Sequence, residues 1–269
     1  MNMHLKRWLT AIIAIPILVL LVGFGPRWVF YCVLCAASLA GLMEFYGITA
    51  ARLPRFVSWT NYFLTFLLFA VLYIRQILLV PVIILLWALV PMTLFMLAHS
   101  SSERESTEEL GKAVLGPIYV TLPLALLVLI DLRPGGQAWI FFLLAVIFAS
   151  DTGAFYFGKL LGKHKLYEAV SPNKTWEGAI GGLIVSVIAA SIFLRLIALH
   201  PLDLSIVILV ITLSAAGQIG DLSQSMLKRN HGVKDSGHIL PGHGGILDRI
   251  DGLLFAIPVL FVYLFFYKV

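Results

Sequence analysis

Charged residues are scarce in this chain. Asp, Glu, Lys and Arg together make up only 12% of its 269 residues, while hydrophobic residues make up 60%. A soluble domain has about a quarter of its residues charged. The composition therefore excludes an ordinary soluble protein and indicates an integral membrane protein whose apolar segments pack into one helical bundle.

Cysteine is rarer still, since the chain contains only two, Cys32 and Cys35. A CxxC pair can be a redox or metal motif, but this one lies in an apolar run with no nearby histidine or acid. Its spacing also fits one face of a helix, so we interpret it as packing. The sequence implies no disulfide framework, shows no internal repeat, and has no His/Cys cluster that would indicate zinc.

Apolar runs long enough to cross a bilayer need about 20 residues. Nine candidates predict an all-α, polytopic membrane bundle with a cytoplasmic N-terminus: 8–24, 28–49, 57–74, 78–98, 113–130, 136–158, 177–199, 204–227 and 250–267. Lys6 and Arg7 precede the first run, which we interpret as an uncleaved helix. We expect 1–130 to be a scaffold that provides any oligomer contacts, and 131–269 to be the catalytic region with cytoplasmic polar loops.

Positive charge in the loops predicts the orientation. With the N-terminus in the cytoplasm, most of the 19 Lys and Arg residues lie on that side, as the positive-inside rule requires. The polar stretch Ser225–Asp251 is then cytoplasmic. The acidic segment 99–112 is expected to be a solvated connector.

A polar stripe runs along the eighth span. Its members recur at helical spacing: Ser214, Gln218, Asp221, Ser225 and Lys228. Asp221 lies seven residues inside Lys228, about 10 Å deep at the rise of a helix. A polar seam between helices is the alternative interpretation, but an aspartate within the stripe favours a functional site.

Asp151 in the sixth span lies eight residues inside Lys159, about 12 Å deep. Two acids at matching depth predict one water-filled cavity open to the cytoplasm. Between the two spans, Pro172 is expected to turn the chain, and Asn173 and Thr175 can cap the next helix. Lys174 would then stand beside a helix N-terminus, a place suited to anions, although an ordinary capped entry into a span also explains this loop.

The stretch SMLKRNHGVKDSGHILPGHGGILDRID, residues 225–251, is the most polar part of the chain. Asp248 and Asp251 are three residues apart and would repel each other on a helix unless a cation lay between them. Carboxylate oxygens suit Mg²⁺, which completes its shell with phosphate and water. The glycines around His243 permit close approach of backbone to phosphate, and His243 is expected to orient a ligand.

This stretch resembles the full signature of the CDP-diacylglycerol synthases, also called phosphatidate cytidylyltransferases. Ser150-Asp151, the segment 171–178 and Gly220-Asp221 resemble other polar segments of that family. The resemblance covers roughly residues 135–269, and the first half is similar only in being hydrophobic. It implies transfer of CMP from CTP to phosphatidate with Mg²⁺ and a second cation of unspecified identity. It also suggests a homodimer among membrane lipids in the bacterial inner membrane, and no nucleic-acid partner is expected.

The resemblance and the residue pattern together predict roles for named side chains. Metal is expected on Asp221, Asp248 and Asp251, which with Lys228 form the expected catalytic set. The expected substrate-binding residues are Asp151, Asn173, Lys174, Ser223, Ser225, Arg229, Lys234, Asp235, His243 and Arg249. Two alternatives are another membrane lipid phosphotransferase or cytidylyltransferase, and a transporter for an anionic substrate. One-sided charge and the lack of an inverted repeat weigh against transport.

Overall fold

The computed structural model describes residues 20–50, 52–98, 105–237 and 244–266. Most of these residues are helical. The helices are η1 (Leu20–Phe24), α2 (Arg27–Thr49), α3 (Arg55–Tyr73), η2 (Ile77–Leu79), α4 (Val80–Ala98), α5 (Glu105–Gly116), η3 (Pro117–Thr121), α6 (Leu122–Asp131), α7 (Gly136–Leu161), α8 (Trp176–Ile197), α9 (Leu204–Asn230) and α10 (Leu247–Phe266). Two strands, β1 (Lys165–Tyr167) and β2 (Ser171–Thr175), form an antiparallel hairpin between α7 and α8.

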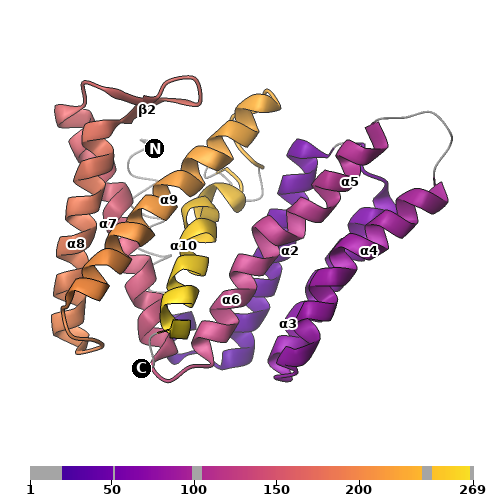
Figure 1. Ribbon diagram of the computed structural model, residues 1–269, viewed down its shortest axis with the longest axis horizontal. Helices are drawn as coiled ribbons and strands as arrows, with labels where there is room; N and C mark the ends of the chain where they lie inside the picture. The colour runs from indigo at the N-terminus through magenta and orange to yellow at the C-terminus, as the bar shows by residue number, and fades with distance from the viewer. Residues whose placement is uncertain (1–19, 51, 99–104, 238–243, 267–269) are drawn as a thin grey trace, which may run out of the picture.

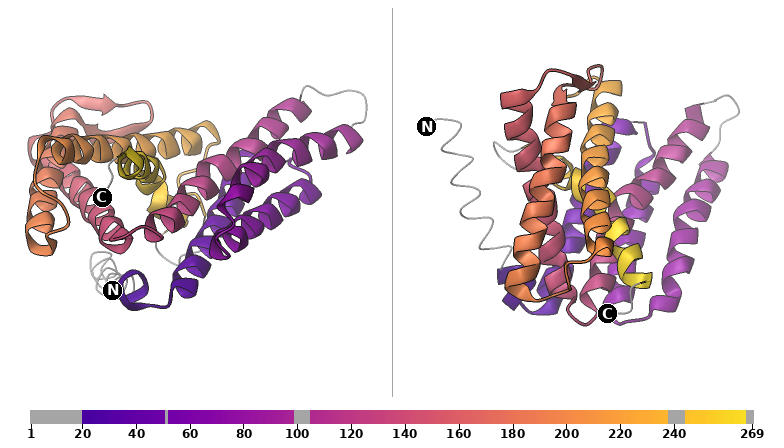
Figure 2. Two further views of the ribbon diagram at one scale, coloured as in Figure 1. Left: turned by 60° about the horizontal axis from the view of Figure 1, so that its bottom comes forward. Right: turned by 60° about the vertical axis from the view of Figure 1, so that its left-hand side comes forward.

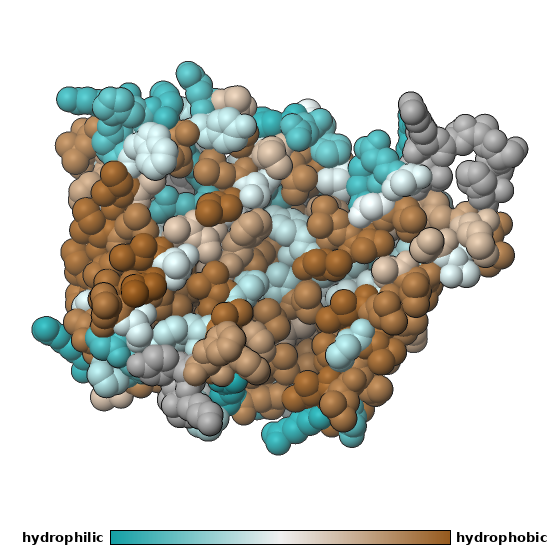
Figure 3. All heavy atoms as spheres, in the orientation of Figure 1, coloured by the Kyte–Doolittle hydropathy of each residue, from teal (hydrophilic) through white to brown (hydrophobic). Residues whose placement is uncertain are grey.

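Eight of these helical segments are long and apolar enough to cross a membrane. They coincide with the second to ninth predicted spans, which confirms an all-α polytopic membrane protein. The first predicted span, 8–24, lies mostly outside the described residues. Figure 3 shows the expected surface, with apolar residues across the middle and hydrophilic residues gathered along the upper and lower margins.

The helices form two groups joined by α10. In Figures 1 and 2, α7, α8 and α9 stand together beneath the hairpin, while α2 to α6 form the other side of the molecule. Helix α8 packs along α7, and α10 packs against both α9 and α6. The hairpin and the C-terminal end of α9 lie at the same end of the bundle (Figure 1), so the polar segments of the second half are gathered there.

A buried carboxylate ties α2 to α6 at the other end of the bundle. Asp131 accepts hydrogen bonds from Arg27 Nη1 at 2.6 Å and from the Tyr31 hydroxyl at 2.9 Å. A buried charge is tolerated when it is paired and hydrogen-bonded. Both donors lie near the start of α2, so this contact fixes that end of the helix.

The fifth span differs from its prediction in two ways. Helix α5 begins at Glu105, before the predicted start of this span at residue 113, and so includes residues 105–112 of the acidic segment. Lys112 pairs with Glu108 at 2.9 Å and with Glu109 at 3.0 Å, spacings that stabilise a helix. The α-helix then becomes a π-helical turn at Pro117–Thr121, where proline supplies no N–H for the regular ladder.

The hairpin is the other departure from the sequence-based expectation. Pro172 lies within β2 instead of turning the chain, which is permissible because β2 is an edge strand. Thr175 caps α8 by accepting a hydrogen bond from Gly178 N at 3.1 Å, as predicted. Glu177 accepts hydrogen bonds from the backbone N–H groups of Lys163 and His164. These contacts anchor both ends of the hairpin to the start of α8.

Candidate functional site

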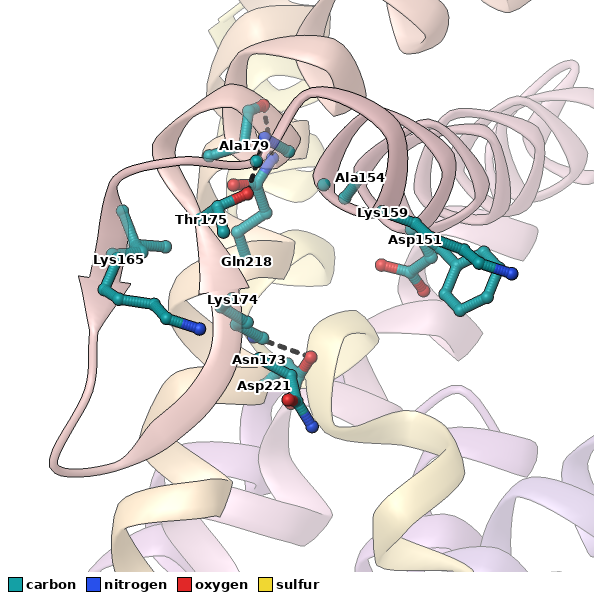
Figure 4. Close-up of a pocket in the computed structure, with 15 residues that line it drawn as sticks. Asp151, Ala154, Lys159, Lys165, Asn173, Lys174, Thr175, Ala179, Gln218 and Asp221 are labelled. Carbon is teal, nitrogen blue, oxygen red and sulfur yellow. Dashed lines mark hydrogen bonds and ion pairs between the residues drawn. The ribbon is translucent and has the colours of Figure 1, made fainter.

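A pocket of about 700 Å³ opens among α7, α8, α9 and the hairpin. This volume is typical of a small-molecule site. Helix α8 contributes only Gly178 and Ala179 to the lining, and the polar side chains come from the other three elements: Asp151, Lys159, Lys165, Asn173, Lys174, Thr175, Gln218 and Asp221. Figure 4 shows Asp151 and Asp221 approaching it from different helices, with Lys165 and Lys174 on the strands of the hairpin. The two acids therefore share one cavity, as their matching depths predict.

Asp221 is the most connected acid of this pocket. Its Oδ2 lies 2.7 Å from Lys174 Nζ, and its Oδ1 accepts a hydrogen bond from Ser225 Oγ at 3.4 Å. The Asp221 side chain remains 43% exposed, so the pair is solvated and contributes little to stability. A ligand can reach both charges.

The polar stripe of α9 divides between two roles. Ser214 Oγ lies 2.6 Å from Ser150 Oγ of α7, and Gln218 Nε2 donates to the Ala179 carbonyl of α8 at 3.1 Å. These residues form the helix–helix seam that was the alternative interpretation of the stripe. Gln218 also lines the pocket, and one turn further along, Asp221 faces it.

A second polar centre lies where α9 ends and α10 begins. Lys228 Nζ and Asp248 Oδ1 are 2.6 Å apart, and their side chains are only 14% and 11% exposed. The other oxygen of Asp248 accepts hydrogen bonds from Ser236 N at 2.8 Å and from Gly245 N at 3.1 Å. Asp248 lies in the first turn of α10, where a negative charge is favourable.

Helix α10 contributes no residue to the lining of this pocket. The ninth span instead packs behind it, against α9. Asp251 in α10 is close enough to Asp221, Lys228 and Asp151 for their charges to act on its carboxylate. The predicted site is thus one pocket and one adjoining ion-pair centre.

The other predicted site residues surround these centres. Asn173 lines the pocket and is exposed, while Ser223 and Ser225 are partly buried on α9. The exposed group consists of Arg229, Lys234, Asp235 and Arg249. His243 lies outside the described residues, so its role stays a prediction.

The donor chemistry of this region suits a hard cation. Asp151, Asp221 and Asp251 interact electrostatically, and their carboxylate oxygens are ligands that Mg²⁺ prefers. In the described part of the chain, however, no three His, Cys, Asp or Glu side chains converge closely enough to hold a metal ion. Both oxygens of Asp248 are already engaged by Lys228 and backbone N–H groups. The predicted metal ligands therefore stay a prediction, with Asp221 and Asp251 the better placed.

One site residue is missing from the sequence-based prediction. Glu44 lies in α2, in a span that the sequence analysis treats as scaffold, and is only 6% exposed. It accepts hydrogen bonds from Ser236, Ile246 and Leu247. Ile246 and Leu247 immediately precede Asp248, and Ser236 donates a hydrogen bond to it. The sequence did contain one indication of this role, a single acid within an apolar run. A charged side chain in a membrane span costs free energy unless it has partners.

A family model described as "Cytidylyltransferase family" matches residues 5–267. The chain belongs to this family. The match runs through both halves of the chain, so the kinship extends well beyond residues 135–269, where the sequence-based resemblance was placed.

Curated relatives of this chain carry the name phosphatidate cytidylyltransferase. The protein from Staphylococcus saprophyticus is 41% identical over 64% of this chain and 66% of its own length. That from Bacillus subtilis is 44% identical over 57% of this chain and 58% of its own length, so these two alignments span under two thirds of each relative. The protein from Staphylococcus aureus strain COL is 34% identical over 94% of this chain and 96% of its own length.

Proposed function

We propose that this cytidylyltransferase is a phosphatidate cytidylyltransferase, which transfers CMP from CTP to phosphatidate and releases pyrophosphate. The observation that carries the proposal is the pocket, whose lining includes Lys159, Lys165 and Lys174 together with Asp151 and Asp221, at the polar end of an apolar bundle. Three lysines suit a ligand with several phosphates. The surrounding membrane spans suit a lipid partner.

The chain's own side chains would act mainly by positioning and charge neutralisation, which dominate phosphoryl transfer. In our proposal, a phosphatidate oxygen attacks the α-phosphorus of CTP and the bond to pyrophosphate breaks. Lys174, which lies on the hairpin, would bind one phosphate group. Further phosphates would be bound near the end of α9 by Lys228, Arg229 and Lys234. Asp221 and Asp251, with the predicted ligand Asp248 beside them, would hold Mg²⁺, and the bound cation would supply charge neutralisation for the phosphates.

We also propose that the pocket faces the cytoplasm across a bacterial inner membrane. Two features support this orientation: the excess of Lys and Arg in the loops on that side, and the position of the hairpin and the end of α9 at one end of the bundle. Phosphatidate would then enter from the cytoplasmic leaflet.

The suggested homodimer is testable by cross-linking in native membranes, where a band at monomer mass alone would contradict it.

One experiment tests both the activity and the orientation. The protein is expressed in cells, and sealed membrane vesicles of both orientations, inside-out and right-side-out, are then prepared from them. CTP, Mg²⁺ and phosphatidate are added to the solution outside the vesicles. We expect CDP-diacylglycerol and pyrophosphate in equal amounts, and only from inside-out vesicles, because CTP does not cross a bilayer. Formation in right-side-out vesicles alone would overturn the orientation, while accumulation of intact CTP without pyrophosphate would indicate a transporter.

Lys174 offers a graded test of the pocket. We expect Lys174→Met to raise the KM for CTP roughly 10-fold, because a hydrogen bond to a charged group is worth about 1.5–3 kcal/mol. The matched control is Lys163→Met, since Lys163 is nearby but is not among the residues that line the pocket. Initial rates over a range of CTP concentrations measure the effect, and equal KM values for the two variants would remove Lys174 from nucleotide binding.

A further inference from the structure

Glu44 is a buried carboxylate that reaches the site from the opposite half of the chain. It lies in α2 with 6% of its surface exposed. Its hydrogen-bond partners are 192 to 203 residues away in sequence. It is not among the residues that line the pocket, so the roles proposed above do not use it.

Both oxygens of Glu44 are occupied by donors from the segment around α10. Oε1 accepts from Ile246 N at 3.0 Å, and Oε2 accepts from Leu247 N at 2.8 Å and from Ser236 Oγ at 3.0 Å. Leu247 is the first residue of α10. The first N–H groups of a helix have no partner within it, and a carboxylate is favourable there. Glu44 thus caps α10 from another helix.

The chain on both sides of α10's start is shaped to admit this carboxylate. A Cβ added at Gly237 or at Gly245 would collide with Glu44 side-chain atoms. Gly237 precedes α10 by ten residues and Gly245 by two, so Glu44 contacts the chain at two separate points before this helix. The close approach leaves no room for any side chain except hydrogen at either position.

Ser236 links Glu44 to the ion-pair centre. Its hydroxyl donates to Glu44, while its backbone N–H donates to Asp248 at 2.8 Å. Asp248 in turn holds Lys228 at 2.6 Å. A chain of hydrogen bonds therefore runs from α2 through Ser236 and Asp248 to the end of α9.

We infer that Glu44 is a positioning residue for the transfer reaction, acting through Ser236 and the start of α10 to hold Asp248 and Lys228 in place. The inference rests on the proposed function for its catalytic consequence. Glu44 is not among the residues that line the pocket, so its loss should lower kcat more than it changes the KM for CTP. A misplacement of about 1 Å at a site can cost about 10²-fold in rate.

The test compares Glu44→Gln with Asp131→Asn. Both replace a buried carboxylate that connects α2 to another helix, but Asp131 binds Arg27 and Tyr31 at the other end of α2. We expect Glu44→Gln to lower kcat by about 10-fold to 100-fold with the KM for CTP within about threefold of wild type. Asp131→Asn should lower thermal stability without lowering kcat of the folded fraction. Ser236→Ala, which keeps the backbone N–H to Asp248, should give a smaller fall in kcat than Glu44→Gln.

A second readout does not depend on catalysis. Limited trypsin digestion at Lys234, an exposed residue two positions before Ser236, should be faster in Glu44→Gln than in wild type or Asp131→Asn. An inactive wild-type protein would defeat the proposed function, and the digestion rates would still decide whether Glu44 holds the chain at Ser236 in place. Wild-type kcat in a folded Glu44→Gln variant, or equal losses of kcat in both variants, would overturn the inference.

Discussion

Asp221→Asn should lower the turnover of CTP by about 10²-fold or more, the size expected when a preorganised electrostatic group is lost from a polar site. The physical reason is the position of its carboxylate. It lies in the pocket, 2.7 Å from Lys174 Nζ, and interacts with the carboxylates of Asp151 and Asp251. Asparagine keeps the shape but removes the charge that would hold Mg²⁺ and balance the lysines.

Pyrophosphate release with CTP and phosphatidate measures this effect, with gel filtration in detergent to show that the variant is folded. Glu168→Gln is the matched control, because Glu168 is an exposed acid in the turn of the hairpin that carries Lys174 and is not among the residues that line the pocket. Its turnover should stay within about twofold of wild type, since surface substitutions are usually nearly neutral. A folded Asp221→Asn enzyme with near-normal turnover would eliminate Asp221 from the proposed catalytic set.

The Mg²⁺ requirement should change in the same variant. If Asp221 and Asp251 share the cation, the Mg²⁺ concentration for half-maximal rate should rise in Asp221→Asn by more than in Asp248→Asn. This order follows from the structure, where both Asp248 oxygens already have protein partners. A larger rise in Asp248→Asn than in Asp221→Asn would indicate that Asp248 is the more important Mg²⁺ ligand.

The membrane spans and the shared pocket could be predicted from the sequence, because both follow from the dimensions of a single helix. An apolar run of about 20 residues sets where a helix crosses the membrane, and eight predicted spans match the structure. Helix rise gives the depth of an acid from the nearest lysine, and this placed Asp151 and Asp221 at one level. Neither argument needs knowledge of which helices are neighbours.

The hairpin and the Glu44 contacts were not accessible because they depend on tertiary packing. Strands β1 and β2 are short, and Ser171–Thr175 has the composition of a turn. They pair because Glu177 and Thr175 anchor them to α8. Glu44 looks like an isolated acid until the fold brings Ser236 and Leu247 beside it. The same limit applies to Asp248, whose spacing from Asp251 indicated a shared cation while the structure pairs it with Lys228.

The Lys228–Asp248 pair predicts a large and strongly non-additive response. Both side chains are nearly buried, at 14% and 11% exposure. Removing one partner of a buried pair leaves an uncompensated charge and costs about 3–5 kcal/mol. Lys228→Met should therefore destabilise the fold by about that amount and also abolish most activity. Asp248→Asn should destabilise it too, although its side-chain oxygen can still accept from Ser236 and Gly245.

The double variant Lys228→Met/Asp248→Asn separates the two contributions. With both charges gone, its unfolding free energy should exceed that expected from adding the single losses by about 1–3 kcal/mol, the range found for residues in direct contact. Its turnover should nevertheless remain about 10²-fold or more below wild type, because the charges proposed to act on phosphate are absent. Thermal unfolding in detergent and pyrophosphate release provide the two measurements. Additive stability losses would show that the 2.6 Å contact is not energetically coupled, and recovery of turnover in the double variant would show that the pair only stabilises the junction of α9 and α10.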